Sequence, residues 1–219
     1  MSDPWMSWDA LVLAGGSARR LGGVDKPAVT IGNQTLLERV LAAVDDARGV
    51  VVVGPRRPVA VARRIVWTRE QPPGGGPVAA LAAGLELVGA PLVAVLAADL
   101  PFVTAETLGA LVRAAGGCDH DGSHPAPGGR AVDNVDSVDN DAVQGAMLVD
   151  PAGRRQYLTG VWRTSALLAR LPAVTSGVPL RSVLTDLRVR MLSADARTTL
   201  DCDEPSDVEQ ARRWARMAG

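Results

Sequence analysis

This chain of 219 residues contains little lysine and little cysteine, and its positive and negative charges are nearly balanced. Cys118 and Cys202 are the only cysteines, and their spacing fits neither a metal cluster nor a disulfide framework. The formal net charge is −1, from 23 basic and 24 acidic residues. No overall field therefore draws the protein to nucleic acid or to a membrane surface, and any binding of an anion must be local.

Long apolar segments are missing as well. The apolar run at 91–98 is far shorter than the roughly 20 residues of a membrane span. The first eight residues contain neither a basic region nor a long apolar region, which argues against a signal peptide. Because 47% of the residues are apolar, the chain can still build a substantial core. These features predict a soluble, cytoplasmic protein with a single domain at 9–217 and a tail at 1–8.

Short apolar runs alternate with amphipathic segments along most of the chain. The predicted strands cover 10–14, 50–53, 65–67, 92–97, 142–149, 157–162 and 189–192. The predicted helices cover 35–47, 77–87, 104–115, 165–171, 179–184 and 205–217, with Thr35, Thr104 and Asp203 as N-caps. This alternation predicts an α/β protein with a Rossmann-like three-layer α/β/α architecture and a mostly parallel central sheet.

Residues 116–141 interrupt the alternation. Glycine, aspartate, serine, asparagine and proline dominate there, which predicts a flexible loop within the domain. His120 and His124 lie in this loop beside acidic residues, so a metal site is one interpretation. A solvated loop is the favoured one, because nothing in the composition fixes a coordination geometry.

The single lysine, Lys26, closes a glycine-rich segment that begins at Leu13. Arginine serves nearly every other basic position, so a retained lysine indicates a site that needs a compact, rotatable ammonium. Glycine pairs in this segment let backbone amides approach an anion, and Arg19 and Arg20 add positive charge. The spacing matches neither the Walker pattern nor the dinucleotide fingerprint. The segment predicts a triphosphate site; the alternative is a tight turn whose arginines face water.

Asp99 follows the most strand-like run of the chain. It is therefore expected at the carboxyl edge of the sheet, where ligands of open α/β sheets bind. A single aspartate close to bound phosphates is a natural Mg²⁺ ligand. The alternative is a helix cap, a role that Thr104 already fills.

Asp201 and Asp203 lie two residues apart before the last predicted helix. In an extended segment, such residues point to the same side. Two carboxylates placed together are unfavourable unless a cation joins them, so the pair is a second candidate for metal binding. For Asp203 the alternative is its predicted role as a helix cap.

The ordered motifs resemble those of the MobA-like nucleotidyltransferase family, which includes the molybdenum cofactor guanylyltransferases. Residues 13–16, 20–22 and 26 match the family's Leu-Ala-Gly-Gly, Arg-Met/Leu-Gly and lysine. Residues 99–101 resemble its Asp-x-Pro motif, and 201–207 resemble its terminal Asn/Asp-x-Asn/Asp-x-Pro-x-Asp motif.

Two further segments are similar to the family pattern with one substitution each. Gly76-Pro77 resembles the family's Asp…Gly-Pro-Leu segment, with Glu70 where aspartate is usual. Residues 156–158 resemble its Gln-Pro-Leu strand, with Tyr157 in place of proline. The resemblance implies GTP as the nucleotide, because Gly15-Gly16 and Leu100 match the guanylyl branch rather than the cytidylyl branch.

The resemblance implies a fold like that of the nucleotide-diphospho-sugar transferases and Mg²⁺-dependent transfer of GMP from GTP to a molybdopterin-type phosphate. The implied catalytic residues are Arg20, Lys26 and Asp99. The implied nucleotide-binding residues are Leu13, Ala14, Gly15, Gly16, Ser17, Lys26, Glu70, Gly76 and Asp99. The implied metal ligands are Asp99, Asp201 and Asp203.

The resemblance also names molybdoenzyme-maturation proteins as candidate partners, and neither nucleic acid nor a membrane. Two alternatives stay open. One is the same chemistry with another nucleotide or acceptor, such as CTP with molybdopterin, or a sugar or alcohol phosphate. The other is a non-catalytic nucleotide-binding relative.

Overall fold

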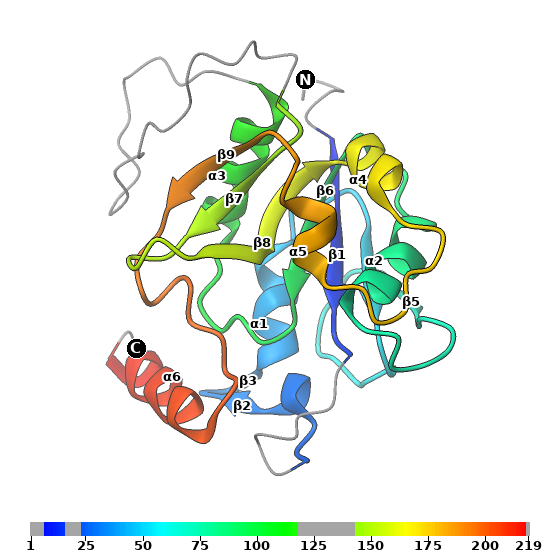
Figure 1. Ribbon diagram of the computed structural model, residues 1–219. Coiled ribbons are helices and arrows are strands. Elements are labelled where there is room, and N and C mark those ends of the chain that lie inside the picture. The colour runs from blue at the N-terminus through cyan, green and yellow to red at the C-terminus, as the bar shows by residue number, and fades with distance from the viewer. Residues whose placement is uncertain (1–6, 16–22, 118–142, 218–219) are drawn as a thin grey trace.

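A twisted seven-stranded sheet forms the centre of the molecule (Figure 1). The computed structural model describes residues 7–15, 23–117 and 143–217. The strand order is β5-β4-β1-β6-β8-β7-β9. The strands are β1 (Trp8–Leu13), β4 (Val50–Val53), β5 (Val66–Thr68), β6 (Leu92–Ala97), β7 (Gly145–Val149), β8 (Arg155–Arg163) and β9 (Val189–Ser193). Among these seven, β8 alone runs antiparallel to both of its neighbours, so the sheet is mostly parallel.

Helices cover both faces of this sheet. They are α1 (Leu36–Ala43), α2 (Pro77–Leu85), α3 (Ala105–Gly116), α4 (Thr164–Arg170), α5 (Leu180–Leu184) and α6 (Pro205–Met217). The smaller elements are the 3₁₀ helix η3 (Lys26–Ala28) and a hairpin of β2 (Thr30–Ile31) and β3 (Gln34–Thr35). None of the helices that the structure describes is long and apolar enough to cross a membrane.

Strand β1 shows how the core is divided. Ala10 and Val12 belong to a cluster that includes the buried side chains of α1 and α3. Leu11 and Leu13 point to the opposite face and pack with α2, α4 and α5. A strand buried on both faces is expected to be largely apolar, which is why the apolar run that begins at Ala10 marked this strand in the sequence. The predicted three-layer α/β/α architecture is confirmed.

The first strand begins two residues before its predicted start at residue 10. Strand β1 begins at Trp8, whose side chain is buried and which pairs with Leu92 of β6. Trp8 therefore belongs to the core and not to a tail. Before the predicted loop at 116–141, α3 continues through Gly116 and is capped by Gly117 in the left-handed conformation. The predicted loop lies outside the described residues from 118 onward.

Helix α1 starts where the sequence predicts but ends earlier. Thr35 and Glu38 form a reciprocal capping box at its N-terminus. The helix stops at Ala43 instead of continuing to residue 47. Arg63 explains this end, because its guanidinium donates to the carbonyls of Val44 and Ala47 at 2.6 Å each. Those carbonyls are thus satisfied without a further helical turn.

The sequence pattern did not predict two local features, the β2–β3 hairpin and the residue that directly precedes α6. The strands of the β2–β3 hairpin are two residues long, too short to carry a recognisable alternation. Helix α6 begins at Pro205 as predicted, but Glu204, not Asp203, directly precedes it, and the Glu204 amide donates to Asp207 at 2.7 Å. The side chain of Asp203 reaches Lys26 instead.

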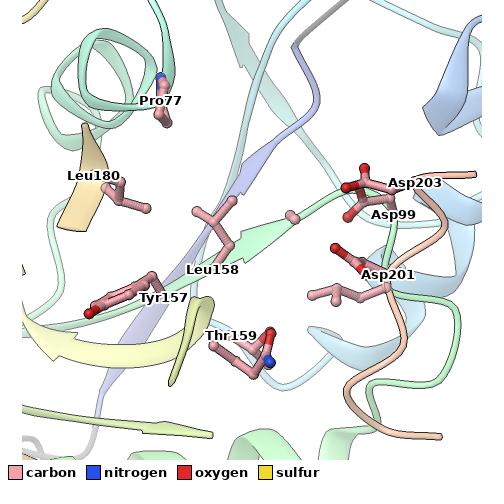
Figure 2. A pocket seen from close by; sticks show the side chains of 11 residues that line it. Pro77, Asp99, Tyr157, Leu158, Thr159, Leu180, Asp201 and Asp203 are labelled. Atoms are coloured by element: carbon pink, nitrogen blue, oxygen red, sulfur yellow. The ribbon is translucent and has the colours of Figure 1, made fainter. Parts of the chain in front are cut away.

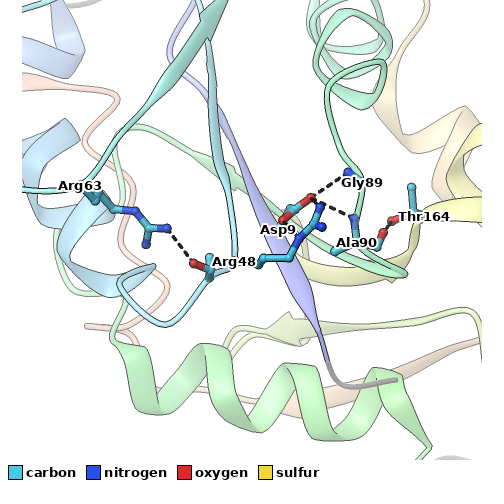
Figure 3. Close-up of polar contacts among 7 residues, drawn as sticks. Asp9, Arg48, Arg63, Gly89, Ala90 and Thr164 are labelled. Carbon is cyan, nitrogen blue, oxygen red and sulfur yellow. Dashed lines mark hydrogen bonds and ion pairs between the residues drawn. The ribbon is translucent and has the colours of Figure 1, made fainter. Parts of the chain in front are cut away.

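A buried carboxylate joins three segments at the edge of the sheet opposite Asp99 (Figure 3). Asp9 in β1 accepts hydrogen bonds from Arg48 Nε and Nη2 at 3.1 and 3.0 Å. It also accepts from the amides of Gly89 and Ala90 at 2.8 and 2.9 Å. Burial would raise the pKa of Asp9, but these four donors outweigh it and lower the pKa below its ordinary value.

Candidate active site

The site forms where β1 and β6 end. Leu13 pairs with Ala97 in the last register position of the two parallel strands, and the Ala98 amide donates to the Leu13 carbonyl at 3.1 Å. The segment that leaves β1 and the segment that carries Asp99 therefore begin side by side. This is the carboxyl edge of a parallel sheet, at which open α/β proteins bind ligands.

Lys26 lies at the start of η3 and is largely enclosed, with 16% of its side chain exposed. Its ammonium contacts the carboxylates of both Asp99 and Asp203. Burial alone would lower the pKa of Lys26, but the two carboxylates outweigh it and raise the pKa. The lysine is therefore held as a cation.

One oxygen of Asp99 has no hydrogen-bond partner in the part of the chain that the structure describes. Asp99 Oδ2 contacts Lys26, whereas Oδ1 is buried and accepts no hydrogen bond from the described residues. A buried, unsatisfied carboxylate oxygen is costly unless another group completes its coordination. This oxygen is thus suited to a ligand from outside the residues that the structure describes.

Asp201 completes a group of three carboxylates. Burial raises its pKa, and the negative charges of Asp203 and Asp99 raise it further. Cys202, between the two aspartates, points into the core, and its amide donates to the Asp99 carbonyl at 3.2 Å. That hydrogen bond attaches the C-terminal segment to the end of β6.

These carboxylates form one end of a pocket of about 330 Å³ (Figure 2). Pro77, Tyr157 and Leu180 lie at the end of the pocket farthest from the carboxylates, and Leu158 lies between the two ends. The pocket is therefore acidic at one end and mainly apolar at the other, as a site for a charged group attached to a flat ring would be. Its complete lining is Pro77, Ala97, Asp99, Leu100, Gln156, Tyr157, Leu158, Thr159, Leu180, Asp201 and Asp203.

The carboxylates could supply some of the ligands of a Mg²⁺ ion but not a complete coordination shell. Across the residues that the structure describes, no three or more histidine, cysteine, aspartate or glutamate side chains are placed to hold a metal ion by themselves. Mg²⁺ is commonly held by one or two carboxylates, with phosphate oxygens and waters as its other ligands. The free oxygen of Asp99 and a second carboxylate meet that requirement.

The other expected nucleotide-binding residues that the structure describes are not among those that line this pocket. Leu13 and Ala14 are buried at the end of β1, and Gly15 is exposed. Glu70 is 7% exposed; Oε1 accepts from the Gly74 amide at 2.9 Å, and Oε2 is buried without a partner among the described residues. Gly76 caps α2 with a φ of 91°. Gly16, Ser17 and Arg20 lie outside the described residues.

Sequence reasoning missed several residues of the site. Leu180 and Thr159 line the pocket, but no local pattern marks either residue. Arg57 contacts both flanks of the glycine-rich segment. It follows a buried strand through Gly54-Pro55, and that signal could have placed it at the same edge of the sheet as Asp99.

Curated proteins that are similar to this chain include several molybdenum cofactor guanylyltransferases. A molybdenum cofactor guanylyltransferase from Nitrobacter hamburgensis is 38% identical over 101 residues, which are 42% of this chain and 48% of that protein. The chain spans about half the length of such curated relatives. The shared part is therefore shorter than either whole protein.

Solved structures with the same fold include two enzymes of different name. Molybdopterin-guanine dinucleotide biosynthesis protein A from Archaeoglobus fulgidus has a TM-score of 0.64 at 19% identity, covering 95% of this chain and 99% of that one. A 2-C-methyl-D-erythritol 4-phosphate cytidylyltransferase from Thermus thermophilus has a TM-score of 0.63 at 20% identity, covering 96% and 99%. These similarities show the fold alone, which is that of the nucleotidyltransferases.

The family is established by a match over most of the chain. The family model of the MobA-like NTP transferase domain matches residues 10–192, which include the whole sheet except the first residues of β1 and the last residue of β9. This protein belongs to the family of MobA-like NTP transferase domains.

Proposed function

We propose that the protein transfers GMP from GTP to the terminal phosphate of a molybdopterin-type acceptor and releases pyrophosphate. One observation carries the proposal: an enclosed, charged Lys26 contacts Asp99 and Asp203 at the carboxyl edge of β1 and β6, where Asp201 lines the same pocket as these two carboxylates. A cation beside metal-type carboxylates is what a triphosphate site requires. The family membership and the curated guanylyltransferase relatives support the same conclusion.

The chemistry requires positioning and neutralisation of charge more than proton transfer. An oxygen of the acceptor phosphate forms a bond to the α-phosphorus of GTP, and the bond from that phosphorus to the bridging oxygen breaks. The acceptor oxygen is already anionic, so no general base is needed. The main difficulty is to bring two polyanions together in line.

Each residue of the site has a defined part in this scheme. Lys26, together with the amides at Gly15–Ser17 and Arg20, would hold the triphosphate and accept the charge that develops on pyrophosphate. Asp99, with Asp201 or Asp203, would hold Mg²⁺. When bound, that ion would neutralise phosphate charge at the reacting centre. The apolar end of the pocket at Tyr157 would receive the acceptor.

The choice of guanine is supported by Glu70. Its buried Oε2 lacks a partner among the described residues, and guanine presents two neighbouring donors, N1–H and the N2 amino group. The fold similarities do not decide the base, because a cytidylyltransferase matches about as well as the guanine-dinucleotide protein. The base preference is therefore a property of local side chains.

A thermal-shift panel of GTP, CTP, ATP and UTP with Mg²⁺ tests the proposal. A nucleotide at about 100 times its Kd adds about 2.7 kcal/mol of stability. We expect GTP alone to stabilise the protein, and Asp99→Asn to weaken that effect. The matched control Asp46→Asn, which removes an exposed carboxylate, should respond like the wild type.

Activity then separates the remaining readings. Pyrophosphate release from GTP that depends on molybdopterin supports the proposal. Release that depends on another phosphate acceptor, or with CTP, moves the protein to a different substrate. No nucleotide binding at all would leave a non-catalytic relative and overturn the proposal.

A further inference from the structure

The loop after β4 sends one arginine side chain inward and leaves its neighbour outside. Arg57 has only 12% of its side chain exposed, whereas Arg56 is exposed. Arg57 Nη1 donates to the carbonyls of Ala14 and Pro55 at 3.0 and 2.9 Å. Its Nε and Nη2 donate to the two oxygens of Asp25 at 2.7 and 2.6 Å. One planar guanidinium thus contacts three separate points of the backbone and side chains.

Two of those points flank the glycine-rich segment. Ala14 is the residue that follows β1, and Asp25 directly precedes Lys26. The Ala14 amide is also held, because it donates to the Val53 carbonyl at 2.8 Å. Both polar backbone groups of Ala14 are therefore fixed by β4 and the loop that follows it. The bidentate pair between Arg57 and Asp25 fixes the start of η3 to the same loop after β4.

The close approach of the two strand ends depends on a glycine. Gly54 has a φ of 146°, and a Cβ atom there would lie 2.7 Å from both the carbonyl carbon and the oxygen of Ala14. Any side chain would push the loop away from Ala14. Gly54 thus allows the Arg57 loop to pack against the beginning of the glycine-rich segment.

The donors of Arg57 are almost fully used. A guanidinium has five N–H groups, and the four hydrogen bonds to Ala14, Pro55 and Asp25 engage four of them. Little remains with which to bind a phosphate directly. Lys26, by contrast, is a compact ammonium that can exchange partners by rotation. The two cations therefore have different tasks.

We propose that Arg57 is a positioning residue for the nucleotide: it fixes the distance between the end of β1 and Lys26, so that the Gly15 amide and the Lys26 ammonium can hold one triphosphate together. This inference rests on the proposed function and extends it to a residue outside the phosphate site. A planar fork is required, because a lysine has three donors and could not make the bidentate pair with Asp25 and both carbonyl contacts at once.

The test compares two adjacent arginines. Arg57→Ala and Arg56→Ala remove the same charge from the same loop, so any difference between them reports on the contacts and not on the overall field. We expect Arg57→Ala to raise the KM for GTP by about tenfold or more, since a misplacement of about 1 Å can cost up to about 100-fold. Arg56→Ala should leave it unchanged. Arg57→Lys should raise the KM for GTP less than Arg57→Ala does, but should not restore the wild-type value.

A role in folding alone would give a different pattern. If Arg57 served only stability, its loss would lower the thermal midpoint and the active fraction, and therefore kcat, without raising the KM for GTP. A double-mutant cycle with Asp25→Ala adds a second readout. If Arg57 acts through Asp25, the combined loss of GTP affinity should be clearly smaller than the product of the two single losses.

The outcomes separate this inference from the proposed function. GTP binding by the wild type, with equal KM values in Arg57→Ala and Arg56→Ala, overturns the role of Arg57 and leaves the proposed function intact. Independent effects of Arg57 and Asp25 also overturn it. Failure of the wild type to bind GTP overturns both. A raised KM confined to the Arg57 and Asp25 variants supports the inference.

Discussion

Lys26 and Asp203 lie 177 residues apart in the chain, and the ammonium of Lys26 donates to Asp203 Oδ1. The segment after the first strand and the segment after the last strand are thus joined at the candidate active site. Because Asp99 contacts the same ammonium, Lys26 is oriented by two carboxylates independently of any nucleotide. Such preorganisation reduces the ordering that binding requires.

The enclosed position of Lys26 predicts that arginine cannot replace it. Lys26→Arg keeps the charge but must fit a wide planar group into a site where 16% of the lysine side chain is exposed. We expect turnover to fall by about 10²–10³-fold, as when one charge-stabilising group is lost. Steady-state pyrophosphate release measures the effect. Arg64→Lys, a swap at an exposed position, is the control, and near-normal turnover of Lys26→Arg would contradict the argument.

The two C-terminal carboxylates should differ in their effects. Asp203→Asn weakens a contact to Lys26, whereas no contact between Asp201 and Lys26 is among the described salt bridges. We expect both variants to need about tenfold more Mg²⁺, a typical cost of disturbing a metal site. Only Asp203→Asn should also weaken GTP binding without metal. Calorimetric titrations of Mg²⁺ and of GTP measure the two effects, and an unchanged Mg²⁺ requirement in both variants would contradict the assigned ligands.

The orientation of Glu70 predicts base selectivity. In Glu70→Gln the amide oxygen can still accept from Gly74, but an NH₂ group then faces the donors of guanine. We expect GTP affinity to fall by about 10- to 100-fold, as when a buried polar pair is mismatched. Affinity for other nucleotides should not fall. The thermal-shift panel measures this, with Glu86→Gln at an exposed position as control. Retention of the full GTP preference would exclude Glu70 from the base site.

The network around Asp9 predicts a dependence of stability on pH. The folded-state pKa of Asp9 lies below its unfolded value of about 3.9, so its contribution is present above that value and is lost as pH falls through the folded pKa. We expect Asp9→Asn to be less stable than the wild type at pH 7 by about 1.5–3 kcal/mol, as for hydrogen bonds to a charged group.

The difference between Asp9→Asn and the wild type should shrink as the pH is lowered below about 4. Denaturant unfolding between pH 2.5 and 7 is the measurement. Asp45→Asn, an exposed carboxylate, is the control. A difference that stays constant across this range would mean that Asp9 acts by its shape and not by its charge.

Two helical glycines should respond in opposite directions to alanine. A Cβ at Gly84 in α2 would lie 2.2 Å from Leu11 Cδ1, in the core between helix and sheet. We expect Gly84→Ala to destabilise the protein by about 1–3 kcal/mol through overpacking. In α3, a Cβ at Gly109 would meet only the end of the Arg113 side chain, at 3.3 Å. Gly109→Ala should stabilise by up to about 1 kcal/mol. Equal effects on the free energy of unfolding would refute this packing difference.

Much of the fold was predictable because its central strands are buried on both faces. The apolar runs of β4 and β6 have the same bounds in the structure as in the prediction. The motifs also predicted that Asp99, Asp201 and Asp203 would gather in one place. Each of these features is recorded in a short stretch of sequence.

The residues that were not predicted depend on contacts between distant segments. In the sequence, Asp9 looks like a polar residue just before a strand. Its buried position follows only from its hydrogen bonds with Arg48, Gly89 and Ala90. Arg57 resembles any loop arginine until Ala14 and Asp25 are placed beside it. No local periodicity records such pairings, because they are set by the packing of whole elements.

The hydrogen bond between the Cys202 amide and the Asp99 carbonyl has a consequence for the order of synthesis. A nascent chain that has reached Ser193 already contains all seven strands of the central sheet. It does not yet contain Asp201, Asp203 or α6. The ribosome therefore delivers all strands of the central sheet before it delivers Asp201 and Asp203, and the candidate site gains these two carboxylates only after its scaffold has been synthesised.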